Sequence, residues 1–275
     1  MRKMNQFKDV ENPAIIPALN KNMLEIFKLL SRSPKSDIKS SDEIIWSITR
    51  IPHPLFNFVL HSSLKTGGAE SAIENVIAEC RSRNVPLMWR IEPDSQPEHL
   101  GTLLEKHGFQ RLDSIPGMVI DIQKNICPPY PNGFEIKRVN SEKILSGYLE
   151  VIKETVGMPD FAIQGLFELS VFLGFEENLP LQRFLGYFNG QPVATCMSVL
   201  GVGVVGIYDV VTKKKARKNG IGSVMTFHSL EIAKRQGYNV GVLTSSEMAQ
   251  SMYEKLGFSE VCKIHQYLWS PQPSA

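Results

Sequence analysis

The sequence predicts a mixed α/β protein with two similar domains, and three observations support this prediction. The chain has 275 residues, and at roughly 150 residues per domain this length suits two domains or one large one. Residues 104–109 read Leu-Glu-Lys-His-Gly-Phe, and residues 253–258 read Tyr-Glu-Lys-Leu-Gly-Phe. In each half a helical pattern and a short strand precede this segment, and a further strand follows it. A shared order of elements indicates an internal duplication.

The predicted domain boundary lies in a proline-rich segment. Residues 125–133 contain three prolines and a glycine, and such a segment continues neither a helix nor a central strand. We therefore expect an N-terminal domain over residues 1–130 and a C-terminal domain over residues 131–275.

The C-terminal half is predicted to place antiparallel strands ahead of a strand, a loop and a helix. Asn189 and Gly190 form a strong hairpin signal, because both positions of such a turn need a positive φ. The predicted elements are strands over residues 134–139, 185–188, 193–200 and 204–212 and helices over residues 142–156 and 161–173.

Composition excludes several classes of protein. The chain has 43% apolar and 21% charged residues, which argues against collagenous and disordered proteins. Thirty basic against 28 acidic residues give a formal charge of +2, whereas nucleic-acid binders usually carry a strong basic surplus. We therefore expect no nucleic-acid partner.

Cysteine spacing and hydropathy favour a cytoplasmic protein without a structural metal. The four cysteines stand far apart and form no Cys-x-x-Cys pair, so neither a disulfide framework nor a metal site is expected. No apolar run reaches the ~18 residues that span a bilayer, and the first 28 residues lack a signal-peptide core. We expect no membrane partner.

A glycine pattern at residues 201–206 matches Gly-x-Gly-x-x-Gly, the fingerprint of dinucleotide sites. That fingerprint works only when a helix begins at the last glycine. Residues 207–211 are instead rich in β-branched and aromatic side chains, which continue a strand. We therefore interpret residues 201–206 as a glycine-rich hairpin turn.

The stronger signal is a strand, a basic glycine loop and a helix in succession. Residues 210–212 read Val-Val-Thr, five of the six residues 213–218 are basic, and Asn219-Gly220-Ile221-Gly222 opens a helical pattern. The first amides of a helix are unpaired and carry partial positive charge, and glycine lets a phosphate approach them. Arg217 would add charge-assisted hydrogen bonds. This succession predicts a site for a phosphorylated ligand.

These residues resemble the GNAT superfamily of N-acetyltransferases. Residues 217–222 resemble that family's acyl-coenzyme A loop, [Arg/Gln]-x-x-Gly-x-[Gly/Ala], and residues 253–258 resemble its Tyr-Glu-Lys-Leu-Gly-Phe signature. The resemblance covers residues 134–268. Residues 40–124 resemble the same fold in a degenerate form, because Leu64 stands where Arg or Gln is expected and Leu104 replaces the tyrosine. An unrelated α/β domain is the alternative for this half.

The resemblance implies two GNAT-like domains, each a mostly antiparallel sheet with a splayed strand pair and flanking helices. It also implies acetyl transfer from acetyl-coenzyme A, bound as co-substrate, directly to an amine in a ternary complex. Ser246 stands where many relatives carry Asn. The residues expected to bind acetyl-coenzyme A are Val210, Val211, Thr212, Arg217, Lys218, Asn219, Gly220, Ile221, Gly222 and Ser246.

Three residues are candidates for the proton transfers. An alkylammonium has no free lone pair, so the acceptor must lose a proton before it attacks. Asp209 is the first candidate for this base, and its alternatives are a ligand for the substrate ammonium or a structural group. Glu247 is the second candidate, and it equally suits the first turn of a helix. Tyr253 matches the family position that protonates the departing thiolate, and its alternative is a core tyrosine.

The acceptor and two competing functions stay open at this stage. Residues 148–180 and the N-terminal half are expected to shape the acceptor site, and a small-molecule amine or a peptide amine would suit it. The alternatives are an acetyl-coenzyme A sensor without turnover and a tandem-GNAT peptidyl transferase that uses aminoacyl-tRNA. A monomer or a homodimer is expected.

Overall fold

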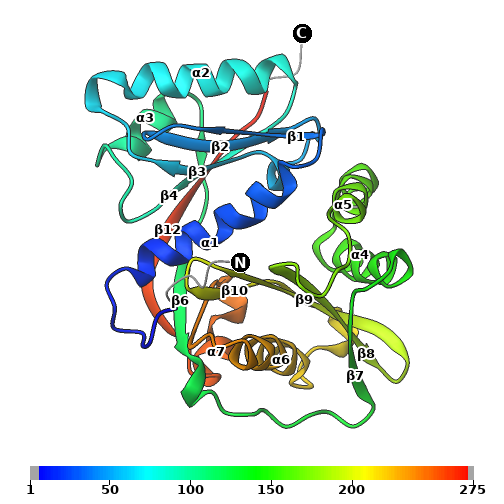
Figure 1. Cartoon of the computed structure of the whole chain (residues 1–275). Helices are drawn as coiled ribbons and strands as arrows, with labels where there is room; N and C mark the ends of the chain where they lie inside the picture. Colours follow the sequence, from blue (N-terminus) through cyan, green and yellow to red (C-terminus); the bar gives the residue numbers. More distant parts are fainter. Residues whose placement is uncertain (1–5, 272–275) are drawn as a thin grey trace. The chain divides into compact units, whose positions relative to one another are not determined.

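The computed structural model describes residues 6–271, which fall into two compact units (Figure 1). Unit 1 contains the described residues up to Ile26 and residues 116–261, and unit 2 contains residues 27–115 and the described residues from Cys262. The chain is thus divided differently from the expected boundary between residues 130 and 131. Each unit takes a segment from the other half, because strand pairing joins residues that are distant along the chain.

The sheet of unit 1 is antiparallel except for one strand pair. Its strand order is β7-β8-β9-β10-β11-β6, and β10 and β11 are parallel. The predicted hairpin turn joins β8 to β9, with Asn189 at φ 51° and Gly190 at φ 76°. The bounds are β6 Ile115–Asp121, β7 Phe134–Arg138, β8 Leu181–Phe188, β9 Gln191–Gly201, β10 Val204–Thr212 and β11 Val240–Thr244.

The parallel pair separates halfway along β10. Its register runs only from Val205, opposite Gly241, to Ile207, opposite Leu243. A β-bulge follows between Tyr208 and Val211, where β10 gains one residue relative to β9. A bulge bends its strand and increases the local twist. The last residues of β10 therefore leave β11 and keep a free edge, which confirms the splayed pair.

Helices cover both faces of this sheet (Figure 1). Helix α6 packs against β9 and β10 on one face, and α4 packs against the same strands on the other. Ser141 caps α4 by accepting a hydrogen bond from the Ile144 amide, and Gly157 ends α4 in the left-handed conformation. The bounds are α1 Ile15–Leu30, α4 Glu142–Val156, α5 Asp160–Leu173, α6 Ile221–Arg235 and α7 Glu247–Lys255.

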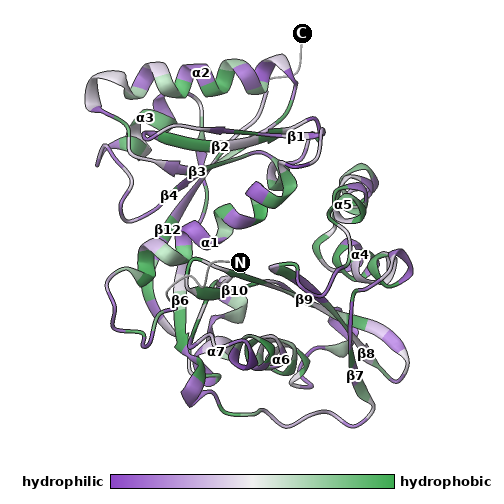
Figure 2. Ribbon diagram, viewed as in Figure 1, coloured by the Kyte–Doolittle hydropathy of each residue, from purple (hydrophilic) through white to green (hydrophobic). Residues whose placement is uncertain are grey.

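The core of unit 1 lies between α6 and the sheet, whose central strands are largely hydrophobic in Figure 2. Val224, Met225 and Leu230 of α6 are fully buried there. Each of these three buried apolar side chains stabilises the fold by ~1.5–3 kcal/mol. Within residues 6–271, no helix is long and apolar enough to cross a bilayer.

Unit 2 repeats the order of elements that unit 1 uses around its splayed pair. Strand β3, the short helix η2, helix α2, strand β4 and helix α3 follow one another, as β10, η4, α6, β11 and α7 do. Here too the first and second strands are parallel. The bounds are β1 Ser36–Ser40, β2 Ile44–Thr49, β3 Phe58–Ser62, β4 Leu87–Ile91, β5 Gln110–Arg111, β12 Ser259–Trp269, α2 Ala69–Ser82 and α3 Leu100–Lys106; the short 3-10 helices are η1 Pro54–Phe56, η2 Thr66–Gly68, η3 Ile122–Lys124 and η4 Lys214–Ala216.

Candidate functional site

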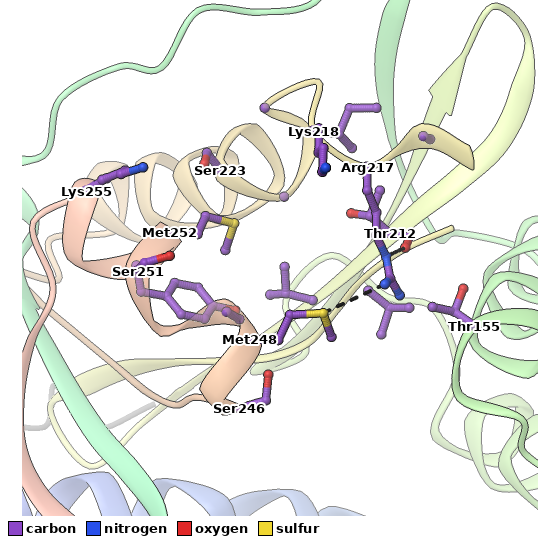
Figure 3. Close-up of a pocket in the computed structure, with 18 of the residues that line it drawn as sticks. Thr155, Thr212, Arg217, Lys218, Ser223, Ser246, Met248, Ser251, Met252 and Lys255 are labelled. Carbon is purple, nitrogen blue, oxygen red and sulfur yellow. Dashed lines mark hydrogen bonds between the residues drawn. The ribbon is translucent and has the colours of Figure 1, made fainter. Parts of the chain in front are cut away.

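A pocket of about 830 Å³ opens where β10 leaves the sheet, within unit 1 (Figure 3). This volume suits a ligand of cofactor size. Its walls come from the ends of α4 and β10, the loop that follows β10, the first turn of α6, and α7. The lining residues are Thr155, Val156, Val210, Val211, Thr212, Ala216, Arg217, Lys218, Gly220, Ile221, Gly222, Ser223, Ser246, Met248, Ala249, Ser251, Met252, Tyr253 and Lys255.

The loop turns into α6 through two left-handed residues. Lys218 has φ 66° and Gly220 has φ 74°. The first helical hydrogen bond runs from the Val224 amide to the Gly220 carbonyl, at 3.1 Å. The amides of Gly220, Ile221 and Gly222 precede it and have no backbone acceptor among the described residues. They therefore point unpaired N–H groups at the pocket end of α6, where the helix dipole also favours an anion.

Gly222 keeps the space between α6 and α7 open. A Cβ at this position would lie 2.9 Å from the Met252 Sδ atom and 3.8 Å from the Thr212 Oγ1 atom. A methyl group would push the flexible methionine aside, whereas a longer side chain would enter the pocket itself. The sequence motif places a small residue here, and the structure gives the steric reason.

Arg217 crosses the pocket from the loop to α7 (Figure 3). Its Nε atom donates to the Thr212 carbonyl at 3.0 Å, and its Nη1 atom lies 3.8 Å from the Met248 Sδ atom. Arg217 and Lys218 are both exposed. The remaining guanidinium N–H groups are therefore available to an anionic ligand.

Two residues of the basic glycine loop have structural contacts instead. The Asn219 side-chain amide donates to the carbonyls of Ala216 and Arg217, at 3.2 Å each, and Asn219 does not line the pocket. Lys213 is only 8% exposed and forms an ion pair with Glu154 of α4 at 2.7 Å. Both contacts fix the shape of the loop, so only part of the basic run faces the pocket.

The free edge of β10 presents alternate backbone amides. The Lys213 amide donates to the Val193 carbonyl of β9 at 2.8 Å, and Val211 lies opposite Thr195 of β9. Backbone groups of a strand alternate between its two edges. The amides of Val210 and Thr212 therefore face the opposite edge, where β11 has already separated.

Tyr253 belongs both to the pocket wall and to the core. It is 5% exposed, lines the pocket and packs edge to face against Phe258 with ring centroids 5.6 Å apart. Burial raises the pKa of Tyr253 well above its usual value, and a hydrogen bond with Thr226 opposes this only in part. The phenol is therefore neutral at physiological pH and carries a proton that it can donate.

The residues at the start of α7 differ in position. Ser246 precedes the helix, is exposed and lines the pocket (Figure 3), and its hydroxyl makes no capping hydrogen bond. Glu247 is the first residue of α7, is exposed and does not line the pocket. Ser246 is thus placed to contact a ligand of the pocket, and Glu247 is not.

Asp209 lies in the β-bulge and does not line the pocket. It has φ 51°, an uncommon conformation for a residue other than glycine, and such strain is concentrated at functional sites. Its Oδ2 atom accepts a hydrogen bond from the Tyr148 hydroxyl at 3.1 Å, and its carbonyl accepts one from the Thr195 hydroxyl at 2.7 Å. Burial raises the pKa of the Asp209 carboxyl, and Arg183 and the Tyr148 hydrogen bond oppose this.

Asp209 is nevertheless an exposed residue. Solvent reaches its side chain, while the surrounding protein is dense enough to disfavour its charge. The exposed carboxyl is therefore within reach of a ligand. The sequence singled out neither Tyr148 nor Arg183. A tyrosine on the apolar face of a predicted helix would have been the only signal, since a buried hydroxyl needs a partner.

Comparison with known proteins finds a family model that matches this part of the chain. Residues 153–258 match the model of the acetyltransferase (GNAT) family, which confirms the predicted resemblance over that segment. No match is found among curated proteins. The matched segment contains the loop, α6, α7 and all of the residues that line the pocket.

Solved structures share the fold over nearly the whole chain. A GCN5-related N-acetyltransferase from Kribbella flavida has a TM-score of 0.71 at 16% identity, with 94% of this chain and 96% of that chain covered. A GCN5-related N-acetyltransferase from Sphaerobacter thermophilus has a TM-score of 0.62 at 16% identity, with 96% of this chain and 95% of that chain covered. A tandem GNAT protein from the clavulanic acid biosynthesis pathway has a TM-score of 0.60 at 12% identity, with 96% of this chain and 97% of that chain covered. At such identities the likeness shows the fold.

Proposed function

We propose, from the GNAT acetyltransferase domain at residues 153–258, that the chain transfers an acetyl group from acetyl-coenzyme A directly to an amine acceptor. The observation that carries this proposal is the row of unpaired amides at Gly220, Ile221 and Gly222, which opens onto a pocket beside the free edge of β10. Such a row favours the pyrophosphate of acetyl-coenzyme A. The finer details below belong to the same proposal.

The residues at the pocket suit the parts of acetyl-coenzyme A in order. Amides at the start of α6 and the Arg217 guanidinium would hold the phosphates. The free edge of β10 would accept the pantetheine amides as an added strand does. The Val210 amide faces this edge and would donate to the thioester carbonyl, and one such donor is worth about 3 kcal/mol to the transition state. Ser246 would contribute its uncommitted hydroxyl at the opposite wall.

Two side chains would handle the protons. Asp209, directly or through water, would take a proton from the acceptor ammonium, and its raised pKa makes it a stronger base than an ordinary aspartate. The amine nitrogen then forms a bond to the acetyl carbonyl carbon as the carbon–sulfur bond breaks. Tyr253 would give its phenolic proton to the leaving thiolate and regain one from the acceptor nitrogen through solvent. The products are an amide, free coenzyme A thiol and one released proton.

The degenerate character of unit 2 is a proposal with its own support. In unit 2 the backbone beyond β3 is already occupied, because the Leu64 amide donates to the Gln96 carbonyl and the Gln96 amide donates to the Ser62 carbonyl, at 3.0 Å each. At the corresponding edge of β10 in unit 1, Arg217 occupies the Thr212 carbonyl, while the amides of Val210 and Thr212 have no acceptor beyond β10 among the described residues. The loop of unit 2 also lacks the arginine, because Leu64 stands at that position and its side chain is buried. We infer that unit 2 binds no acetyl-coenzyme A.

The test of the proposed function is the release of free thiol from acetyl-coenzyme A in the presence of a panel of amines. Release that requires both an amine and the protein, and that falls at least about 100-fold in Asp209→Asn, supports the proposal. Binding of acetyl-coenzyme A without release for any small or peptide amine would instead leave the chain a sensor. Release that requires aminoacyl-tRNA would make it a peptidyl transferase.

A further inference from the structure

A second charged group, Arg183, lies near Asp209, and the catalytic scheme does not use it. Arg183 lies on β8 opposite Met197 of β9, which in turn lies opposite Tyr208 of β10. Residues directly opposite in a sheet share a face. The Cys196 Sγ atom lies 3.1 Å from the Ser229 hydroxyl of α6, so the neighbouring residues Thr195 and Met197 face the other side. Arg183 therefore lies on the face that α4 covers.

Arg183 is close enough to Tyr148 and Asp209 for both to influence its charge. Its guanidinium nevertheless forms no hydrogen bond and no ion pair with any residue in the described range 6–271. Burial lowers the pKa of Arg183, yet a guanidinium keeps its proton in proteins and offers five N–H donors. The Arg183 side chain is only partly buried, so its guanidinium reaches solvent and its N–H groups are available to an acceptor that arrives from outside.

Asp209 and Arg183 thus present opposite charges that do not neutralise each other by direct contact. The Tyr148 hydroxyl accounts for one oxygen of the Asp209 carboxylate, and the other oxygen has no partner in the described chain. Among the described residues, Arg183 is the charged side chain that acts on the pKa of Asp209. The Cys196 thiol is also near, and burial raises its pKa to about 12, which keeps it neutral. A ligand that satisfies both groups must carry a cation and an anion close together.

We propose that the acceptor is an amine that carries a carboxylate on a neighbouring carbon, with its ammonium on Asp209 and its carboxylate on Arg183. This inference rests on the proposed function and names the substrate class of that site. Arg183 would bind the carboxylate through paired N–H groups, the geometry in which guanidinium is most selective. Tyr148 would hold the Asp209 carboxylate in the bulge, next to Val210. Arg183 would then favour amines that carry the anion over amines that lack it.

The test compares three classes of acceptor in the wild-type chain with acetyl-coenzyme A as donor: α-amino acids, the corresponding amino-acid amides, and simple alkylamines. We expect kcat/KM to be at least about 10-fold higher for the best amino acid than for its amide, since a charge-assisted hydrogen bond contributes ~1.5–3 kcal/mol. Equal kcat/KM for the acid and its amide, or turnover of alkylamines with no amino acid accepted, would overturn the inference. No thiol release with any amine would instead contradict the proposed function.

Variants of Arg183 separate a specificity role from a structural one. Arg183→Gln is expected to raise KM for the amino acid about 10-fold or more and to leave kcat/KM for the amide within about 2-fold. Arg183→Lys, which keeps the charge without the paired geometry, should recover part of the preference. Arg235→Gln, at the end of α6, is the matched control. Equal loss for both acceptors in Arg183→Gln, with wild-type affinity for acetyl-coenzyme A, would overturn the inference.

Discussion

Tyr253 combines a packing role with a hydroxyl that catalysis would use. Its ring fills the core beside Phe258, and this burial raises the pKa of the phenol, so that the hydroxyl remains protonated. The raised pKa also makes the phenol a weaker acid than a thiol with a pKa near ~8.5, so its proton would pass to the leaving thiolate only as the acceptor nitrogen gives one back. The two interpretations that the sequence left open, a proton donor and a core tyrosine, are therefore compatible.

Replacing Tyr253 by phenylalanine removes the proton and leaves the packing. We expect Tyr253→Phe to lower kcat about 100-fold and to change the affinity for acetyl-coenzyme A by less than about 3-fold, because the ring still fills its place. Steady-state kinetics and calorimetry measure the two quantities. Tyr238→Phe, a change outside the pocket lining, is the control. An unchanged kcat in Tyr253→Phe would leave that residue with a packing role alone.

At the scale of single residues, the sequence predicts what a local motif contains. Arg217, Gly220 and Gly222 fall within six residues, and all three line the pocket as expected. Tyr148 bonds to Asp209, and Arg183 lies near it, only because the fold brings α4 and β8 to the same region of the sheet. Long-range packing sets their positions relative to Asp209, and no local sequence pattern predicts that packing.

At the scale of elements, the two splayed strand pairs have different free edges. Beyond Ile207, β10 has no partner on the side of β11. In unit 2 the segment at Gln96 bonds to the backbone beyond β3 on both sides of Ser63. An added strand of pantetheine requires unpaired backbone groups, and of the two described strand pairs the one at β10 offers them, at the amides of Val210 and Thr212.

This difference predicts the stoichiometry of binding. Titration calorimetry should give one acetyl-coenzyme A per chain, because only unit 1 has both a free strand edge and an arginine in the loop. Leu64→Arg adds the missing loop charge to unit 2 but leaves its edge occupied, and the stoichiometry should stay at one. Two sites of similar affinity in the wild type would contradict the assignment of unit 2 as degenerate.

Elements with strong local signals were predictable, and the bulge was not. The turn at Asn189 and Gly190 and the helix that begins at Ile221 agree with the turn and loop residues in the sequence. The left-handed backbone of Asp209 carries no such signal, because aspartate prefers it only weakly. The bulge arises where the sheet must open, which is a property of the strands around it.

At the scale of the whole molecule, the compact units combine segments that are distant along the chain. Strand β6 follows the first repeat but pairs with β11 of the second, from Asp121 opposite Val240 to Gly117 opposite Thr244. The end of β12 pairs with β4, from Trp269 opposite Leu87 to His265 opposite Ile91. A proline-rich segment indicates where a linker lies, but it does not show which strands pair. The boundary expected at residues 130 and 131 therefore marks the linker, whereas the compact units are defined by strand pairing between distant segments.

Glu92 in unit 2 makes the stability of the molecule depend on pH. It is 5% exposed, and burial raises the pKa of its carboxyl from 4.5 to about 8 against the opposing effect of Arg90. Between these two values the folded chain keeps a proton that the unfolded chain has lost. The free energy of unfolding must therefore fall as pH rises from about 4.5 to about 8.

Glu92→Gln removes this titration. The variant should match the wild type near pH 5 and exceed it near pH 9 by on the order of 3 kcal/mol in the free energy of unfolding. Denaturant unfolding followed by circular dichroism at both pH values measures the difference. The exposed Glu98→Gln variant is the control and should retain the wild-type slope. If the free energy of unfolding of Glu92→Gln fell with pH as steeply as that of the wild type, Glu92 would be ionised in the folded chain.

The central claim is that the start of α6, with Arg217, binds the phosphates of acetyl-coenzyme A. The most direct measurement is calorimetric titration of acetyl-coenzyme A into the wild type and into an Arg217→Ala, Gly222→Glu double variant. We predict a loss of affinity of at least about 100-fold, because the variant removes charge-assisted bonds of ~1.5–3 kcal/mol and places a carboxylate in the cleft. Gly67→Glu, where a Cβ meets nothing within 4 Å, should bind as the wild type does. Equal affinity in the double variant would contradict the claim.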